Sequence, residues 1–184
     1  MGRLIFSAIA SLDGYTVDAS GSFDWAEPDP ELHAFVNDLE RGVGTYLYGR
    51  RMYETMRWWQ DPTLPEGEQV YADYAAIWQD ADKVVYSATL AEATTPRTRV
   101  IRRFDAGEVR RLVDDADRAV SIGGPTLAAE AFAAGLVDEV WLFLSPVSVG
   151  GGTPALPLGM RLDLELLDER RFAAGTVALH YGVH

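Results

Sequence analysis

Apolar, strand-like segments alternate with amphipathic, helix-like segments along almost the whole chain. The apolar runs lie at residues 3–11, 45–48, 83–87, 100–101, 119–122 and 140–144. Between the first two, Leu32, Phe35 and Leu39 recur at i, i+3 and i+7, which places them on one face of a helix. This βαβ alternation predicts an α/β fold with a mostly parallel sheet and helices on both faces, in one domain spanning residues 1–184.

The end of the chain departs from that alternation. Two extended runs, 162–172 and 176–183, are separated by a short turn that ends at Gly175, which is typical of an antiparallel hairpin. Two other segments, 12–28 and 146–159, are rich in glycine, proline and small polar residues and are predicted to be long loops.

Composition excludes several classes of function. A net charge of -12 repels nucleic acid and anionic membranes. The chain has no cysteine, which excludes thiol nucleophiles and Cys-ligated metals, and its three histidines show no ligand spacing. The apolar start, residues 4–12, is too short for a signal peptide, and no run approaches the ~20 residues of a membrane span. We expect a cytoplasmic protein without a metal site.

The strongest local motif for ligand binding is the segment 121–127. An apolar strand runs into Gly123 and Gly124 and then directly into a helix that begins near Pro125. Glycines allow a phosphate to approach the backbone, and the free N–H groups at a helix start attract anions. A plain strand-to-helix turn would have the same sequence, so the motif alone leaves both interpretations open.

A second strand-to-helix corner follows Tyr48. Gly49 is succeeded by Arg50 and Arg51, which occupy the first turn of the predicted helix 50–58. Cations are unfavourable at the positive end of a helix dipole, so a bound phosphate would explain the pair. The alternative is that both arginines are solvated surface charges.

Two further features are set aside as ligand motifs. Gly150, Gly151 and Gly152 fit the letters of a dinucleotide fingerprint, but Pro154 and Pro157 discourage the helix that must follow. Trp58 and Trp59 are interpreted as packing or subunit-contact residues.

Five segments together resemble the dihydrofolate reductase superfamily, in the branch that contains the reductase domain of riboflavin biosynthesis. They are residues 11–14, 48–51, 84–87, 121–127 and 145–154, and they occur in family order. The resemblance implies a three-layer α/β/α sandwich, dihydrofolate reductase-like, with about eight strands. It also implies NADPH as cofactor and a homodimer. The zinc deaminase part found in many riboflavin enzymes is missing here, and an extra helix is predicted at 70–79.

The resemblance also assigns site residues. Those expected at the cofactor are Ala8, Gly14, Tyr15, Gly49, Arg50, Arg51, Ser87, Ile122, Gly123, Gly124, Pro125, Thr126 and Leu127. Residues 15–24 would form a mobile cover that excludes water.

Glu31 is the candidate catalytic residue, because folate reductases carry an acid in this helix. It would donate a proton or anchor the substrate, or it is an exposed first-turn acid that the helix dipole favours. The resulting hypothesis is an NADPH-dependent reductase acting on a pteridine or ribosylamino-pyrimidine. Its alternatives are a non-catalytic NADP-binding sensor or partner module, and another α/β enzyme that uses the glycine turn for a different phosphate.

Overall fold

The computed structural model describes residues 2–62 and 69–184. Its strands are β1 (Leu4–Ser11), β2 (Tyr15–Asp18), β3 (Val43–Gly49), β4 (Asp82–Tyr86), β5 (Thr98–Ile101), β6 (Ala119–Gly123), β7 (Glu139–Ser145), β8 (Gly152–Pro154), β9 (Leu164–Arg171) and β10 (Val177–Val183). Its helices are α1 (Pro30–Glu40), α2 (Arg50–Met56), α3 (Gln69–Asp80), α4 (Ala106–Asp114) and α5 (Pro125–Ala133), with 3-10 turns η1 (Asp24–Ala26) and η2 (Arg57–Gln60). The extra helix expected at 70–79 is α3.

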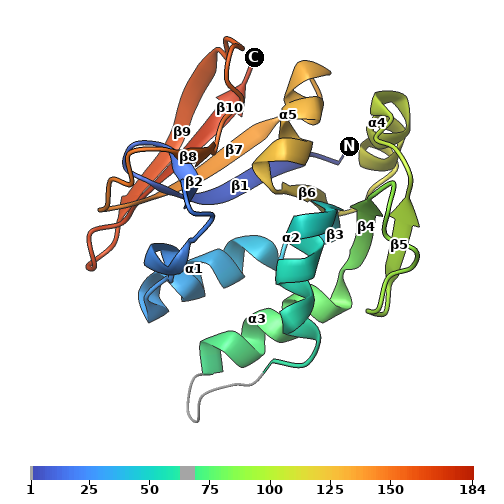
Figure 1. Cartoon of the computed structure of the whole chain (residues 1–184), viewed down its shortest axis with the longest axis horizontal. Coiled ribbons are helices and arrows are strands. Elements are labelled where there is room, and N and C mark those ends of the chain that lie inside the picture. Colours follow the sequence, from blue (N-terminus) through green and yellow to red (C-terminus); the bar gives the residue numbers. More distant parts are fainter. Residues whose placement is uncertain (1, 63–68) are drawn as a thin grey trace.

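Eight of the strands form one sheet in the order β5-β4-β3-β6-β1-β7-β10-β9 (Figure 1). The pairs from β5 to β7 are all parallel, whereas β10 is antiparallel to both β7 and β9. The mostly parallel sheet with a C-terminal antiparallel hairpin is therefore confirmed.

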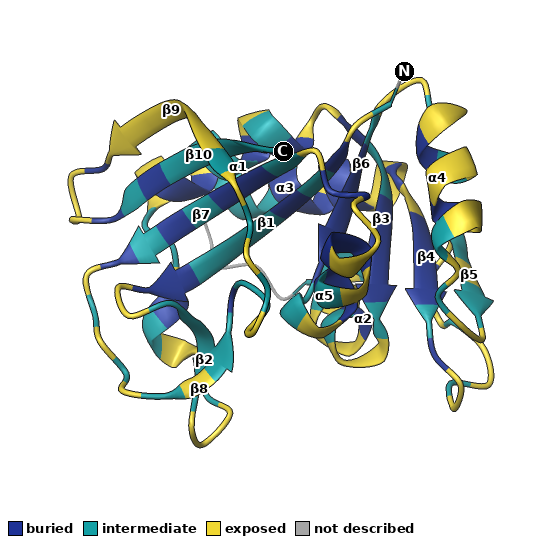
Figure 2. Cartoon of the chain, turned by 90° about the horizontal axis from the view of Figure 1, so that it is seen from above, coloured by how far each residue is buried: buried dark blue, intermediate teal, exposed yellow. Residues whose placement is uncertain are grey.

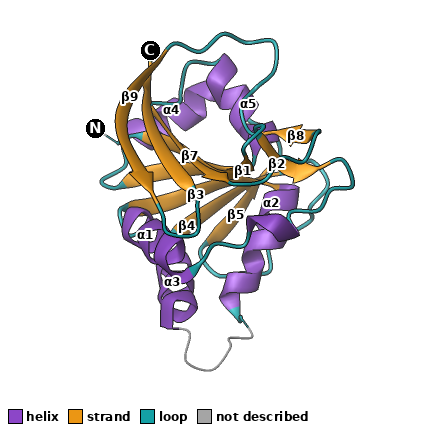
Figure 3. Cartoon of the chain, turned by 90° about the vertical axis from the view of Figure 1, so that its left-hand side faces the viewer, coloured by secondary structure: helices purple, strands orange, loops and turns teal. Residues whose placement is uncertain are grey.

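Helices cover both faces of this sheet (Figure 3). α4 and α5 pack on one face, where Val109 and Phe132 join the buried side chains of the central strands. α1, α2 and α3 pack on the other face, around Tyr53 and Trp78. The three-layer α/β/α sandwich expected from the resemblance is confirmed.

Alternation along β3 shows how one strand serves both layers. Leu47 points into the cluster under α4 and α5, while its neighbours Tyr46 and Tyr48 point into the cluster under α2 and α3. Successive side chains of a strand lie on opposite faces, so a strand covered on both sides must be apolar throughout. The central strands are accordingly dark along most of their length in Figure 2.

Two helices begin at N-cap acids. The Asp29 carboxylate accepts hydrogen bonds from the backbone N–H of Glu31 at 2.8 Å and of Leu32 at 3.1 Å. Asp105 accepts from the N–H of Glu108 at 2.8 Å. Each cap satisfies helix-start donors that have no partner inside the helix.

The two segments predicted as long loops each contain a short strand, so that prediction is wrong in this respect. β2 lies in the first segment and β8 in the second, and they pair antiparallel as a separate two-stranded sheet. The pairing joins residues more than a hundred positions apart, and neither strand is apolar enough to be found by its own pattern.

Candidate functional site

A cleft of about 2250 Å³ lies at the carboxyl ends of the parallel strands. Gly49, Tyr86 and Gly123, the last residues of β3, β4 and β6, all line it, and Ala8 of β1 lines its wall. Ligands of open α/β sheets bind at this edge, where the strand ends and the following helix starts converge.

The structure brings the glycine corner and the arginine corner together. β3 is hydrogen-bonded to β6, with Tyr48 opposite Gly123. A Cβ built on Gly49 would lie 3.9 Å from Cβ of Leu127, and one built on Gly124 would lie 3.3 Å from Cβ of Met52. The first turns of α2 and α5 therefore adjoin at one wall of the cleft.

The glycine corner has the geometry of a phosphate cradle. Gly124 has φ of +90°, and it caps α5 without any side-chain hydrogen bond. A Cβ on Gly123 would lie 2.8 Å from the Tyr48 ring, closer than real Cβ contacts allow. A bare backbone at the start of a nine-residue helix, whose first N–H groups have no partner within the helix itself, suits an anion. These residues fit the pyrophosphate of a dinucleotide.

Arg50 and Arg51 differ in what holds them. Arg50 donates from Nε to Glu54 at 2.7 Å and from Nη1 to Thr89 at 3.0 Å. Arg51 is exposed and lines the cleft, and its guanidinium makes no hydrogen bond or ion pair within the described part of the chain. The Arg51 side chain can therefore bind a ligand without breaking any hydrogen bond or ion pair to another described residue.

Two further arginines, not identified from the sequence, lie at this end of the cleft. Arg102 and Arg103 follow β5, the edge strand, and both line the cleft. The Nη1 of Arg102 donates to the carbonyl of Leu90, which ties it to the loop after Ser87. The sequence does contain a pattern that indicates them, because a pair of arginines follows the apolar strand β5 just as a pair follows β3.

Ser87 lies on the cleft wall just beyond β4. Its hydroxyl oxygen accepts a hydrogen bond from the N–H of Leu90 at 3.0 Å. Together with the neighbouring arginines it forms a polar end to the cleft within an acidic protein.

The other end of the cleft is aromatic. Its walls come from α1, from η2 and from α3, and include His33, Trp58, Trp59 and Tyr74. The two tryptophans, expected to serve packing or a subunit contact, also line the cleft. A flat, apolar ring would find stacking partners at this end.

Glu40, at the last position of α1, was not identified from the sequence. It lines the aromatic end of the cleft and is only 8% exposed. Burial raises the pKa of its carboxyl to about 7, and the neighbouring hydroxyls of Tyr46 and Ser7 act in the opposite direction. Its Oε2 is buried and makes no hydrogen bond within the described residues. The site thus contains an acid that exchanges its proton near neutral pH.

The segment expected to cover the cleft does lie along it. Residues 16–21, Phe23 and Asp24 line the cleft, as do Gly152 and Thr153 of β8. Gly14 and Tyr15 are not brought into the lining, since they turn from β1 into β2. Ile122 is fully buried in the core under α5 instead.

Glu31 lies away from the cleft. Its carboxylate accepts hydrogen bonds from Arg170 at 3.2 Å and from the N–H of Ala173 at 3.1 Å, both in the β9–β10 hairpin. The exposed position follows from its place in the first turn of α1. The structure therefore offers no support for Glu31 as the proton donor.

No helix within residues 2–62 and 69–184 is long and apolar enough to cross a bilayer. In the same residues, no cluster of His, Asp or Glu is arranged to hold a metal ion.

Known proteins resemble this chain over nearly its whole length. The protein YyaP of Bacillus subtilis strain 168, which is uncharacterized, is 28% identical over 181 residues, covering 97% of this chain and 94% of its own. A provisionally named riboflavin biosynthesis protein from Shewanella sp. PV-4 superposes with a TM-score of 0.76 at 19% identity, covering 99% of both chains.

A second solved structure is a two-activity enzyme. The diaminohydroxyphosphoribosylaminopyrimidine deaminase/5-amino-6-(5-phosphoribosylamino)uracil reductase of Thermotoga maritima has a TM-score of 0.69 at 16% identity, and this chain spans 57% of it. At such identities the two superpositions establish the fold alone. A family model for the RibD C-terminal domain, however, matches residues 3–178. The resemblance to the riboflavin-reductase branch is confirmed, and the chain belongs to the RibD C-terminal domain family.

Proposed function

We propose that this protein is an NADPH-dependent reductase that delivers hydride to a small heterocycle of the pteridine or ribosylamino-pyrimidine type. The observation that carries the proposal is the junction of the glycine corner and the arginine corner at one cleft. Family membership supports a reductase, and the name of the Thermotoga maritima enzyme suggests the class of substrate.

The two ends of the cleft would bind different molecules, the cofactor at one end and the substrate at the other. Gly123 and Gly124, with the start of α5, would hold the pyrophosphate, and Arg50 and Arg51 would bind phosphate groups. Ala8 would border the nicotinamide, which supplies the hydride when bound. Residues 16–24 would exclude water from that ring.

The aromatic end would hold the substrate. Trp59 and Tyr74 offer ring faces there, and Glu40 offers a proton. Glu40 thus takes the role for which Glu31 was the sequence candidate, because it lines the cleft and Glu31 does not.

Cofactor binding is tested by thermal unfolding with NADPH. NADPH at a hundred times its Kd should add about 2.7 kcal/mol of stability. In a protein of this size we expect Tm to rise by about 5–10 °C. Arg51→Ala should weaken NADPH binding about tenfold to a hundredfold, because a charge-assisted hydrogen bond is lost.

Arg161→Ala is the matched control, since Arg161 is an exposed arginine outside the cleft lining. It should bind NADPH like the wild-type protein. Absence of any shift at saturating NADPH, or equal losses in the two variants, would argue against the proposal.

A binding module without catalysis would use the same cleft. A turnover assay distinguishes it from a reductase. Loss of NADPH absorbance with dihydrofolate or a ribosylamino-pyrimidine indicates a reductase. Tight NADPH binding without such loss favours the sensor or partner module. The homodimer stays a prediction, to be measured by analytical ultracentrifugation.

A further inference from the structure

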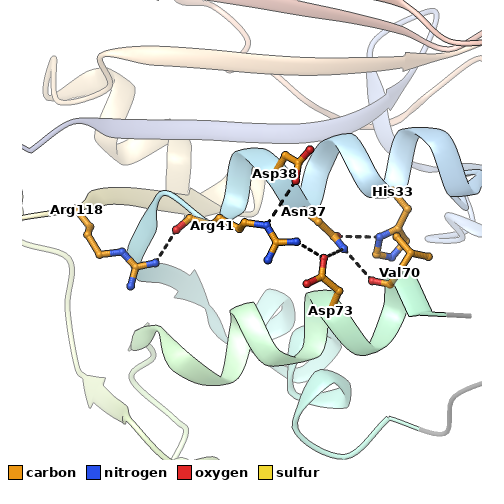
Figure 4. A network of polar contacts seen from close by, with 7 residues as sticks. All are labelled: His33, Asn37, Asp38, Arg41, Val70, Asp73 and Arg118. Atoms are coloured by element: carbon orange, nitrogen blue, oxygen red, sulfur yellow. Dashed lines mark hydrogen bonds and ion pairs between the residues drawn. The ribbon is translucent and has the colours of Figure 1, made fainter.

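A polar chain of side chains runs between α1 and α3 (Figure 4), and it ends at His33, which lines the cleft. Its outer end is the ion pair of Arg41 with Asp73, at 2.6 Å. Asp73 accepts a hydrogen bond from Nδ2 of Asn37 at 2.8 Å, and Oδ1 of Asn37 lies 3.0 Å from Nδ1 of His33. His33 is 5% exposed and is among the residues that line the cleft.

The orientation of the Asn37 amide follows from its partners. Nδ2 faces the carbonyl of Val70 at 2.8 Å as well as the carboxylate of Asp73. Both groups only accept hydrogen bonds, so the donor side of the amide must point at them. Oδ1 is therefore the atom that faces His33.

The tautomer of His33 follows in turn. An amide oxygen can only accept, so Nδ1 of His33 must carry the proton of this hydrogen bond. In the neutral ring, Nε2 then holds the lone pair. Within the described part of the chain, Nδ1 is the one ring nitrogen of His33 that makes a hydrogen bond.

Aromatic rings fix the plane of the imidazole. The ring centroids of Tyr71, Tyr74 and Trp59 lie 4.7, 5.8 and 5.9 Å from that of His33. Trp59 and Tyr74 also line the cleft. The imidazole is thus held by rings on several sides and by one hydrogen bond at Nδ1, with Nε2 left to a ligand.

We propose that His33 contacts the substrate through Nε2 as a hydrogen-bond acceptor, and that Asn37 is the positioning residue that fixes its tautomer. The ligand class is a flat heterocycle with a ring N–H or an exocyclic amino group, flanked by the aromatic side chains. This inference rests on the proposed function in locating the substrate at the aromatic end of the cleft.

The tautomer is measured by long-range ¹H–¹⁵N NMR of the three histidine side chains, in protein without cofactor or substrate. His33 should be protonated at Nδ1. His180 and His184 are internal references, because their Nε2 atoms lie 3.0 and 3.1 Å from Glu139 and Glu165 and must carry protons there. A His33 ring protonated at Nε2 alone overturns the proposal, whether or not the protein binds NADPH.

Two variants separate positioning from mere packing. Asn37→Ala removes the acceptor, so His33 should lose its preference for the Nδ1–H tautomer. Asp73→Asn is the matched control, since it leaves Asn37 facing Val70 and His33 and should keep the tautomer. Retention of the tautomer in Asn37→Ala contradicts the positioning role. If Asn37→Ala does not fold, the wild-type spectrum still decides.

The substrate contact is tested with 5-aminouracil as the probe. Its addition to the wild-type protein, with and without NADP⁺, should shift the Nε2 resonance of His33 and leave those of His180 and His184 in place. His33→Phe, which keeps a ring but no acceptor, should bind the probe at least tenfold more weakly. An Nε2 resonance that does not move at millimolar probe overturns the contact, while the NADPH experiment independently decides the proposed function.

Discussion

At the scale of single residues, Glu40 makes the stability of the fold depend on pH. Its carboxyl has a pKa of about 7 in the folded protein, against an ordinary value of 4.5, because it is buried. Between these values the unfolded chain releases the proton while the folded protein keeps it, so stability falls as pH rises from 4.5 through 7 and is level above. Glu40→Gln should remove this loss, which amounts to about 3 kcal/mol. Urea unfolding of both proteins across this range measures it, and parallel pH curves would contradict a buried acid.

Gly124 and Gly49 form a matched pair for the cofactor corner. Gly124 has φ of +90°, and a Cβ added to it would lie only 3.3 Å from Cβ of Met52. A Cβ added to Gly49 would make an ordinary 3.9 Å contact with Leu127. Gly124→Ala should therefore cost roughly 1–3 kcal/mol and weaken NADPH binding, because the strained turn must rearrange. Gly49→Ala should cost less, about 0.5 kcal/mol, because its φ is negative and only the poorer N-cap preference of Ala counts against it. Urea unfolding measures both, and equal effects would show that the positive φ is unimportant.

At the scale of elements, Asp13 ties the turn after β1 to the loop before β8. Its carboxylate accepts the N–H groups of Val149 at 3.1 Å and Gly150 at 2.7 Å. The hydroxyl of Ser11 and these N–H groups hold the pKa of Asp13 well below its usual range. The clamp therefore stabilises the protein above the ordinary pKa and is lost only as pH falls through the lower folded value.

Asp13→Asn should open this clamp, because an amide accepts less strongly and brings donors toward the N–H groups. We expect faster hydrogen exchange at Val149 and Gly150 in the variant. The amides of β7, in the main sheet, serve as the internal control. Unchanged exchange at both positions would show that the β2–β8 pairing holds the loop without Asp13.

At the scale of the whole molecule, Lys83 reports on global unfolding. It is the only lysine of the chain, is 1% exposed, and donates to the carbonyl of Trp78 at 3.1 Å. Burial lowers its pKa to about 8, so above that pH the amine is neutral and intrinsically reactive. If an amine reagent labels Lys83 slowly above this pH, burial must be the cause. The labelling rate should then rise with the unfolded fraction as urea is added. Arg161→Lys, which places a lysine at an exposed position, should label at once. Rapid labelling of Lys83 in the native protein would contradict the packed core.

The sequence by itself determined the local elements. The period of apolar residues predicted the central strands and helices, since periodicity acts over a few residues. Gly123, Gly124 and the arginines after Gly49 were found for the same reason. These local patterns did not predict the order of the strands in the sheet. The three-layer sandwich was predicted from the family resemblance.

Only the tertiary structure decided which distant residues meet. Pairing of β3 with β6 brings the two corners together, and pairing of β2 with β8 turns two predicted loops into a small sheet. Burial at the cleft distinguishes Glu40 from the exposed Glu31, although both are acids on one helix. The environment of a side chain is set by contacts distant in the chain, and no local pattern encodes them.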